Sequence, residues 1–370
     1  MVFPALLLLA AQLPTGPLSL EYREPNGYLL SLLKRLDIPV SSQTLVFSKT
    51  SAQSHLIFPS APRAIFFNDD VYVGWVRGSD FLEISYADPV RGALFYLLEQ
   101  DPTAKPRLVP KDTCLQCHES SRTFGIPGHL LRSVHPQSTG HPYTDRGSFT
   151  TDDTSPFAER WGGWFVTAST PLNFPHMGNQ VFPMIENPKT LARFDDPSWP
   201  AATSDAVAIM VLAHQVAGHN RLAYLDHESR AALSLQHTMN KMDGKPDLVA
   251  NWSGSTQRRI TRVIESTVRY LTFADEEPFP QPIRGDSTFA QDFQRRGPLR
   301  TLNCDTRLFE LPLSYVIFSK SIDRLDPVVK QRFFARLEQV LTRDAGQVAF
   351  TKLSPAKAKE AWRAYSKSVR

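Results

Sequence analysis

The sequence is poor in cysteine, with three in 370 residues, and this excludes a structural zinc site built from two pairs of thiols. The third cysteine, Cys304, stands far from the other two, and we expect it to be a small buried residue of the core. A phosphate-binding loop, a recognisable catalytic triad and carboxylates paired at an interpretable spacing are also missing from the sequence.

Charge of one sign and long apolar runs are scarce as well. The 41 basic and 37 acidic residues leave a net charge of +4 without any block of Lys or Arg, so nucleic acid binding is not expected. The apolar run of residues 3–13 is too short to span a bilayer, and no other run approaches the length of a membrane helix. We therefore expect no membrane span in the mature chain.

The other two cysteines form the one motif that names a cofactor, Cys114-Leu115-Gln116-Cys117-His118. This is the attachment sequence of c-type haem: two thiols bond to the porphyrin vinyl groups and the adjacent histidine binds the iron. A zinc site lacks its second ligand pair here. A dithiol redox centre prefers a helix that starts after a strand, which the residues before Asp112 do not predict. The sequence predicts one covalently attached haem c.

The segment after the motif, residues 119–131, resembles the corresponding loop of class I cytochromes c. In that family a loop proline offers its carbonyl to the second ring nitrogen of the ligating histidine, and a helix follows. Pro127 lies nine residues after His118 and fits this place, although it is not directly preceded by Gly125 as in the family's Gly-Pro. The resemblance implies that Pro127 orients His118; the alternative is a plain turn.

A wider resemblance is to a large, essentially uncharacterised family of bacterial proteins that carry one cytochrome c domain. Besides the haem motif, it rests on Arg63–Val76, Glu159–Trp164, His176–Asn179, Thr306–Glu310 and Leu313–Tyr315. It covers most of the mature chain and implies a haem segment that is integral to the fold. It does not supply an activity.

The haem motif also predicts the compartment, because bacteria attach haem to thiols outside the cytoplasm. Residues 3–13, followed by Pro14, Gly16 and Pro17, are typical of the apolar core of a signal peptide. We predict a signal peptide over residues 1–19 and a periplasmic or otherwise exported protein. No Lys or Arg precedes the run, so the translation start could lie elsewhere, or the segment could be a buried N-terminal helix.

The sixth iron ligand has several candidates. Met177 lies 59 residues after His118 between Pro and Gly, as in the loops that supply the distal methionine of class I cytochromes. Met177 is our first choice, and it predicts slow binding of external ligands. The alternatives are a five-coordinate iron or a histidine, namely His176, His129, His135 or His141. His129 is disfavoured because the resemblance places it at the start of the proximal helix.

Arg160 and Trp161 are candidate haem contacts. A guanidinium suits the anionic propionates of haem, and an indole ring can pack on the macrocycle. The same residues can instead be core packing around Gly162 and Gly163. Two further histidines, His214 and His219, are five positions apart on a predicted helix and so do not share a face, and we interpret them as hydrogen-bonded core residues.

The periodicity predicts an α+β fold: an N-terminal antiparallel β meander, a cytochrome c-like haem segment and C-terminal helices. Alternating apolar residues predict strands over 64–67, 71–76, 82–86, 93–97 and 162–167. Helical spacing appears over 26–38, 205–224, 255–273, 326–343 and 355–369, with Asp326 and Ser354 as N-caps. We divide the chain into a β-rich region (20–105), a haem region (106–185) and a helical region (186–370) packed as one unit.

Two classes of function follow from the motif. The first is a monohaem electron-transfer protein with a saturated iron and a redox partner protein. The second is a haem enzyme, a peroxidase or small-molecule dehydrogenase, with an open iron position. A sensor that reports redox state or ligand is a third possibility. The length of the chain favours the enzyme, and the loop around Met177 favours the carrier.

Overall fold

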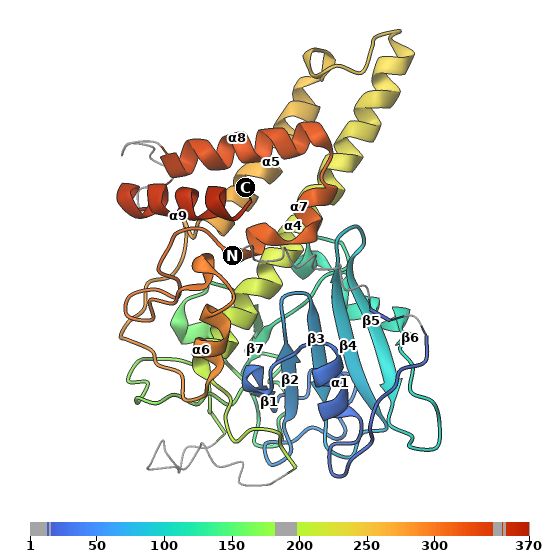
Figure 1. The fold of residues 1–370 in the computed structure, drawn as a ribbon, viewed down its shortest axis with the longest axis vertical. Coiled ribbons are helices and arrows are strands. Elements are labelled where there is room, and N and C mark those ends of the chain that lie inside the picture. Colours follow the sequence, from blue (N-terminus) through green and yellow to red (C-terminus); the bar gives the residue numbers. More distant parts are fainter. Residues whose placement is uncertain (1–12, 15, 182–197, 343–349, 351–352, 370) are drawn as a thin grey trace, which may run out of the picture.

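A computed structural model describes residues 13–14, 16–181, 198–342, 350 and 353–369. It confirms the α+β class: an antiparallel sheet fills the N-terminal half and helices fill the C-terminal half (Figure 1). The sheet is a meander of β1 (Thr44–Val46), β2 (Arg63–Phe67), β3 (Val71–Trp75), β4 (Phe81–Asp88), β5 (Gly92–Glu99) and β6 (Val109–Pro110). The four strands predicted before residue 100 correspond to β2, β3, β4 and β5.

The two faces of the sheet are buried against different partners. Leu82 and Ile84 of β4 point to the face covered by α1 (Leu29–Arg35), where they join one apolar cluster. Tyr72 and Phe67 point to the other face and join the larger cluster of the helical half. This alternation follows from the period of two along a strand. It places the helices of the C-terminal half and the haem motif on the same face of the sheet, opposite α1.

Helices dominate the second half of the chain. They are α4 (Ala206–Met242), α5 (Gly254–Leu271), α6 (Phe289–Gln294), α7 (Lys320–Arg324), α8 (Pro327–Thr342) and α9 (Pro355–Ser368). The Asp326 carboxylate accepts from Val328 N at 2.9 Å, as expected of an N-cap, whereas Ser354 makes no such bond. Asp205 caps α4 by accepting from the amides of Val207 and Ala208.

Helix α4 is much longer than the predicted segment 205–224. Its first three turns are buried on all sides, whereas its last four turns bury only a narrow stripe against α5. Because that stripe includes Ser229, Gln236 and Asn240, the apolar spacing fades after Leu225 although the helix continues. The C-terminal part of α4 and the N-terminal part of α5 form the hairpin that projects at the top of Figure 1.

The haem region differs from the class I pattern. The described residues directly after Pro127 form no helix; β7 (Arg132–Val134) and β8 (Ser148–Thr150) form a short hairpin there instead. The expected helix beginning at His129 is therefore wrong. The expected strand over 162–167 is reduced to single bridges, Trp164 with Val46 and Thr167 with Asp205.

The signal peptide predicted over residues 1–19 lies partly within the described residues. Residues 1–12 lie outside the described residues. Leu18 is buried in the α1 cluster, and its amide donates to the Pro106 carbonyl at 2.7 Å. Leu13 joins the same cluster, and the signal peptide over residues 1–19 stays a prediction.

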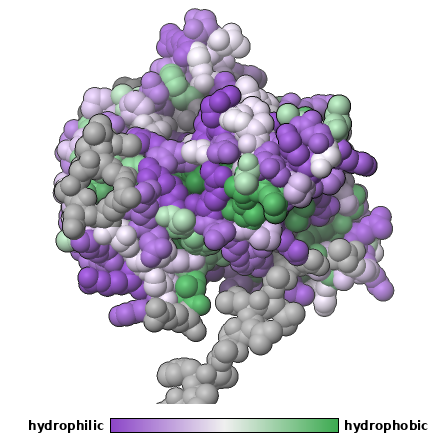
Figure 2. All heavy atoms as spheres, turned by 90° about the horizontal axis from the view of Figure 1, so that it is seen from above, coloured by the Kyte–Doolittle hydropathy of each residue, from purple (hydrophilic) through white to green (hydrophobic). Residues whose placement is uncertain are grey.

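Within the described residues, none of the helices has both the length and the apolar character needed to cross a membrane. Hydrophilic residues cover most of the face seen from above in Figure 2, with small apolar patches between them.

Candidate haem-binding site

The motif forms a single helical turn on the surface. Its first cysteine ends a 3-10 helix, η2 (Asp112–Cys114), which continues as α2 (Leu115–His118). Positions three apart on a helix are neighbours, about 5–6 Å between Cβ atoms. Both thiols are free, with Cys114 half-buried and Cys117 exposed. Burial raises the pKa of the Cys114 thiol, and the nearby carboxylate of Glu83 raises it further. The two thiols are thus accessible from one side of the turn.

His118 is oriented for metal binding through Nε2. Its Nδ1 lies 3.0 Å from the carbonyl oxygen of Gly128, and its ring packs on Phe95 with centroids 4.6 Å apart. Among the described residues Nε2 has no hydrogen-bond partner. Burial lowers the pKa of His118, which favours the neutral imidazole that binds iron. A bond from Nδ1–H to a carbonyl fixes the tautomer that leaves Nε2 as the acceptor of a metal.

The carbonyl that orients His118 is not the expected one. The Pro127 carbonyl accepts from Ala93 N of β5 at 3.0 Å and so ties the loop to the sheet edge. The next residue, Gly128, supplies the carbonyl that meets His118. Nδ1 of His118 therefore meets a backbone carbonyl, as the resemblance implies, but this carbonyl belongs to the residue after the expected proline.

Helix α4 determines this register. The Asn220 side chain bonds to both the amide (2.9 Å) and the carbonyl (2.7 Å) of His129. Gly128 fits because a Cβ there would lie 2.7 Å from the Asn220 oxygen and 2.8 Å from Cβ of Thr123. The loop after the motif is thus clamped between β5 and α4, and its geometry depends on a small residue at position 128.

We expect Gly128→Ala to lower the free energy of unfolding by about 1–3 kcal/mol, the usual cost of overpacking. The added methyl has to push Asn220 or Thr123 aside. Urea unfolding measures the loss. Gly254→Ala is the control, since the nearest atom there is the flexible Arg258 guanidinium at 3.2 Å. Equal stability of the two variants would contradict the tight packing at Gly128.

A partly open strip of the sheet lies beside the motif. Phe95 and Leu97 of β5 share a face with Glu83 of β4 and are only half-buried. Glu83 pairs with Arg63, whose side chain crosses β3 at Gly74, where a Cβ would lie 2.4 Å from the guanidinium. Both charges act on His118, so this strip adjoins the proximal side of the motif. It offers apolar surface next to the thiols.

Two arginines missed by the sequence reasoning lie on the other side. The guanidinium groups of Arg122 and Arg132 converge on the hydroxyl of Ser148, at 3.3 Å and 2.9 Å. Burial and the Arg122 charge lower the pKa of Arg132, whereas the nearby Cys117 raises it. Arg122 lies four residues after the motif, and this proximity in the sequence could have marked it as a haem contact. Arg132 comes near the motif only because the β7–β8 hairpin forms. Both suit the propionates of a haem.

Arg160 and Trp161 are placed elsewhere, in the core. Arg160 donates to the backbone carbonyls of Ser155 (2.8 Å) and Asp153 (2.9 Å) and lies over the ring of Phe157. Trp161 is 1% exposed and packs edge-on against Phe157. None of these contacts involves the motif. The structure favours the packing interpretation for both residues.

Met177 is also a packed residue. It is 3% exposed, its sulfur accepts from the Ser133 hydroxyl at 3.7 Å, and its amide donates to the Arg160 carbonyl. Gly162 lies against its methyl group. Its neighbour His176 packs against Trp161 (5.3 Å). The hydrogen bonds of this segment do not join it to His118, so ligation of iron by Met177 requires it to leave Ser133.

The remaining histidines have different surroundings. His135 is half-buried on the β7–β8 hairpin, and exposed His141 bonds to Thr139. His129 is buried between Phe95 and Tyr72, and its Nε2 has no partner. Burial holds the pKa of His129 well below its usual value. Among the described residues no cluster of three or more His, Cys, Asp or Glu is arranged to hold a bare metal ion.

His214 and His219 are hydrogen-bonded core residues, as predicted. His219 Nδ1 lies 3.0 Å from the Tyr72 hydroxyl. His214 Nδ1 lies 2.7 Å from the Asp153 carboxylate and its Nε2 lies 2.6 Å from the Ser314 hydroxyl. This Ser–His–Asp chain was not visible in the sequence, because its members are 61 and 100 residues apart. Ser314 is fully buried and its hydroxyl accepts from the Val316 amide, so the chain links structural elements.

His219 predicts a loss of stability in acid. Burial lowers its pKa from 6.5 to about 4, so the unfolded chain binds a proton between these values and the folded chain does not. Stability therefore falls as the pH falls through this window. Between pH 7 and pH 4.5, the free energy of unfolding of His219→Gln should fall by about 2 kcal/mol less than that of the wild type, as measured by urea unfolding. Parallel losses in both proteins would contradict the assignment to His219.

Cys304 is buried, with its sulfur 4.0 Å from the Leu308 carbonyl, as predicted for a core residue. Burial raises its pKa to about 12, so its thiol is inert at neutral pH.

Comparisons of the chain with protein-family models, curated proteins and solved structures found no match.

Proposed function

We propose that the chain is an exported monohaem c-type cytochrome that binds one haem covalently and transfers electrons to or from a partner protein. The observation that carries the proposal is the geometry of the motif. Two free thiols share one side of a helical turn, and the adjacent histidine has its Nδ1 held by the Gly128 carbonyl and its Nε2 without a partner. This arrangement leaves Nε2 of His118 free to bind the iron of a haem.

The surroundings fit a haem group. The half-buried face of Phe95 and Leu97 offers apolar contact beside His118. Arg122 and Arg132 offer cations near Cys117 for the propionates. Attachment adds each thiol S–H across one vinyl C=C, which gives a thioether without an external oxidant. The bound haem supplies a one-electron Fe(III)/Fe(II) couple.

The experiment is a purification from cells that attach haem in the periplasm, followed by acid-acetone extraction. We expect the haem to stay with the protein and the optical spectrum to change reversibly with dithionite and ferricyanide. A protein that loses all its haem to the solvent, or carries none, overturns the proposal.

A haem enzyme with an open iron position is the second candidate. It is favoured by the position of Met177, whose sulfur bonds to Ser133 and not to the motif. Cyanide binding separates the two classes, because a saturated iron has to lose a ligand before it binds cyanide. Slow binding to the oxidised wild type supports the carrier, and rapid binding supports the enzyme.

A further inference from the structure

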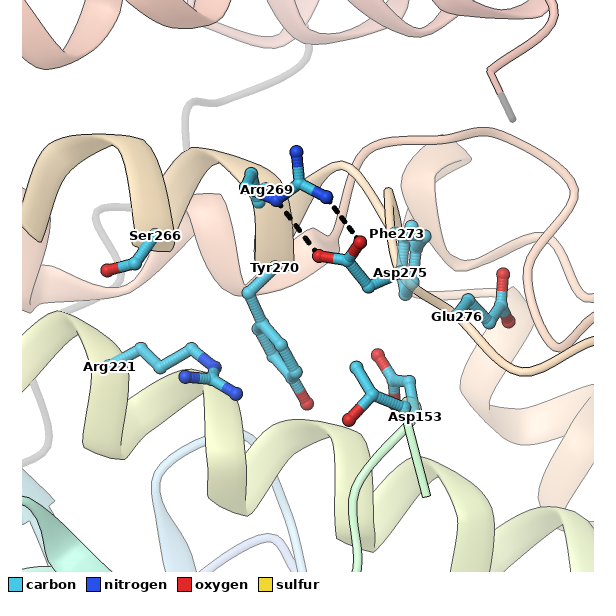
Figure 3. A pocket seen from close by; sticks show the side chains of 9 residues that line it. Asp153, Arg221, Ser266, Arg269, Tyr270, Phe273, Asp275 and Glu276 are labelled. Atoms are coloured by element: carbon cyan, nitrogen blue, oxygen red, sulfur yellow. Dashed lines mark hydrogen bonds and ion pairs between the residues drawn. The ribbon is translucent and has the colours of Figure 1, made fainter. Parts of the chain in front are cut away.

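A cavity of about 180 Å³ lies between α4, α5 and the segment around Asp153, apart from the haem motif. Figure 3 shows Arg221 reaching into it from α4, with Tyr270 above and Asp153 opposite. An engineered apolar cavity of about 150 Å³ holds benzene, so this volume suits a small molecule of similar or slightly larger size. The lining is mostly charged, which excludes a purely apolar occupant.

One side of the cavity presents an unsatisfied guanidinium. One Nη–H of Arg221 donates to Asp152 Oδ2 at 3.2 Å, and the Arg221 Cζ lies 4.3 Å from the centre of the Tyr270 ring. Its Nε is buried, whereas its other Nη makes no hydrogen bond with the described residues. The two Nη groups of a guanidinium can meet a carboxylate with two parallel hydrogen bonds. This unbonded Nη is the donor that a carboxylate entering the cavity would meet.

The opposite side presents an acceptor. Asp153 uses Oδ2 for His214 at 2.7 Å, and its Oδ1 accepts no hydrogen bond from the described part of the chain. His214 is itself fixed by Ser314, so the carboxylate is held in place. Glu276 also lines the cavity, and its charge is paired with Arg307. A simple anion bound to Arg221 would meet repulsion from these carboxylates.

We propose that this cavity binds a small zwitterion, an α-amino acid with an aliphatic side chain, with its carboxylate on Arg221 and its ammonium group on Asp153. The aromatic rings of Tyr270 and Phe273 leave apolar surface for the side chain. Each end of such a ligand satisfies one of the two unpaired groups. The site does not depend on haem binding.

Isothermal titration of the purified protein with L-valine tests the proposal, and the half-ligands isovalerate and isobutylamine are its controls. We expect valine to bind, and each half-ligand to bind at least ~10-fold more weakly, because each one leaves one charged group unpaired. Absence of valine binding at millimolar concentration, or equal binding of isovalerate, overturns the proposal.

Variants locate the site. Arg221→Gln should weaken valine binding at least ~10-fold, since it removes the bidentate partner of the carboxylate. Arg259→Gln is the matched control: Arg259 lies on α5 outside the cavity, paired with Glu228, and should leave binding unchanged. Thermal unfolding of both variants without ligand reports their folding. Wild-type affinity in a folded Arg221→Gln variant contradicts the assignment. If this variant does not fold, the half-ligands still test the proposal, because they are measured on the wild-type protein.

Discussion

Replacement of Cys114 and Cys117 together by serine should abolish covalent haem. Thioether bonds need sulfur, and these are the two cysteines of the motif, both free and on one side of the η2–α2 turn. The measurement is haem staining of the denatured protein after acid-acetone extraction. Loss of the signal should be complete, because no other pair of thiols exists in the chain.

Cys304→Ser is the matched control. Its sulfur is buried near Leu308 and has no part in the motif, so the variant should keep its haem even if it is somewhat less stable. Single replacements of Cys114 or Cys117 should leave one thioether. Covalent haem in the double variant would show that the central proposal is wrong.

The sequence predicted the elements whose own residues determine them. Alternation along 64–97 predicts β2 to β5 because each strand buries one set of side chains per face. The spacing of the two cysteines and the histidine is equally local, so the motif was recognised without the fold. The end of α4 was missed because its last turns bury polar residues such as Gln236 and Asn240.

The surroundings of the motif could not be predicted in the same way. The partner of His118 is Gly128 and not Pro127, because Asn220, about ninety residues later, fixes the register of the loop. Arg132 joins Arg122 only when the β7–β8 hairpin forms. Arg160, which precedes Trp161 in the sequence, is directed into the core by carbonyls of its own loop. Such contacts depend on tertiary structure and leave no periodic signal.

Met177→Ala should lower the free energy of unfolding by about 2–5 kcal/mol, as expected when a buried methionine is truncated. The side chain is 3% exposed and fills the space against Gly162, with its sulfur on Ser133. Met239→Ala is the control: Met239 is 40% exposed on α4, and its truncation should change stability by less than about 0.5 kcal/mol. Urea unfolding measures both.

Met177→Leu separates packing from iron ligation. Leucine conserves the volume, so its cost in stability should stay below about 1.5 kcal/mol, but it has no sulfur to offer to iron. Because the structure places the Met177 sulfur on Ser133, we expect the visible spectrum, the reduction potential and the rate of cyanide binding to match the wild type. If Met177 binds iron instead, the leucine variant has to lose the weak sulfur-to-iron band, fall in potential and bind cyanide faster. That result would place Met177 at the distal side, and it would mean that the loop after Phe174 moves away from Ser133 when haem is attached.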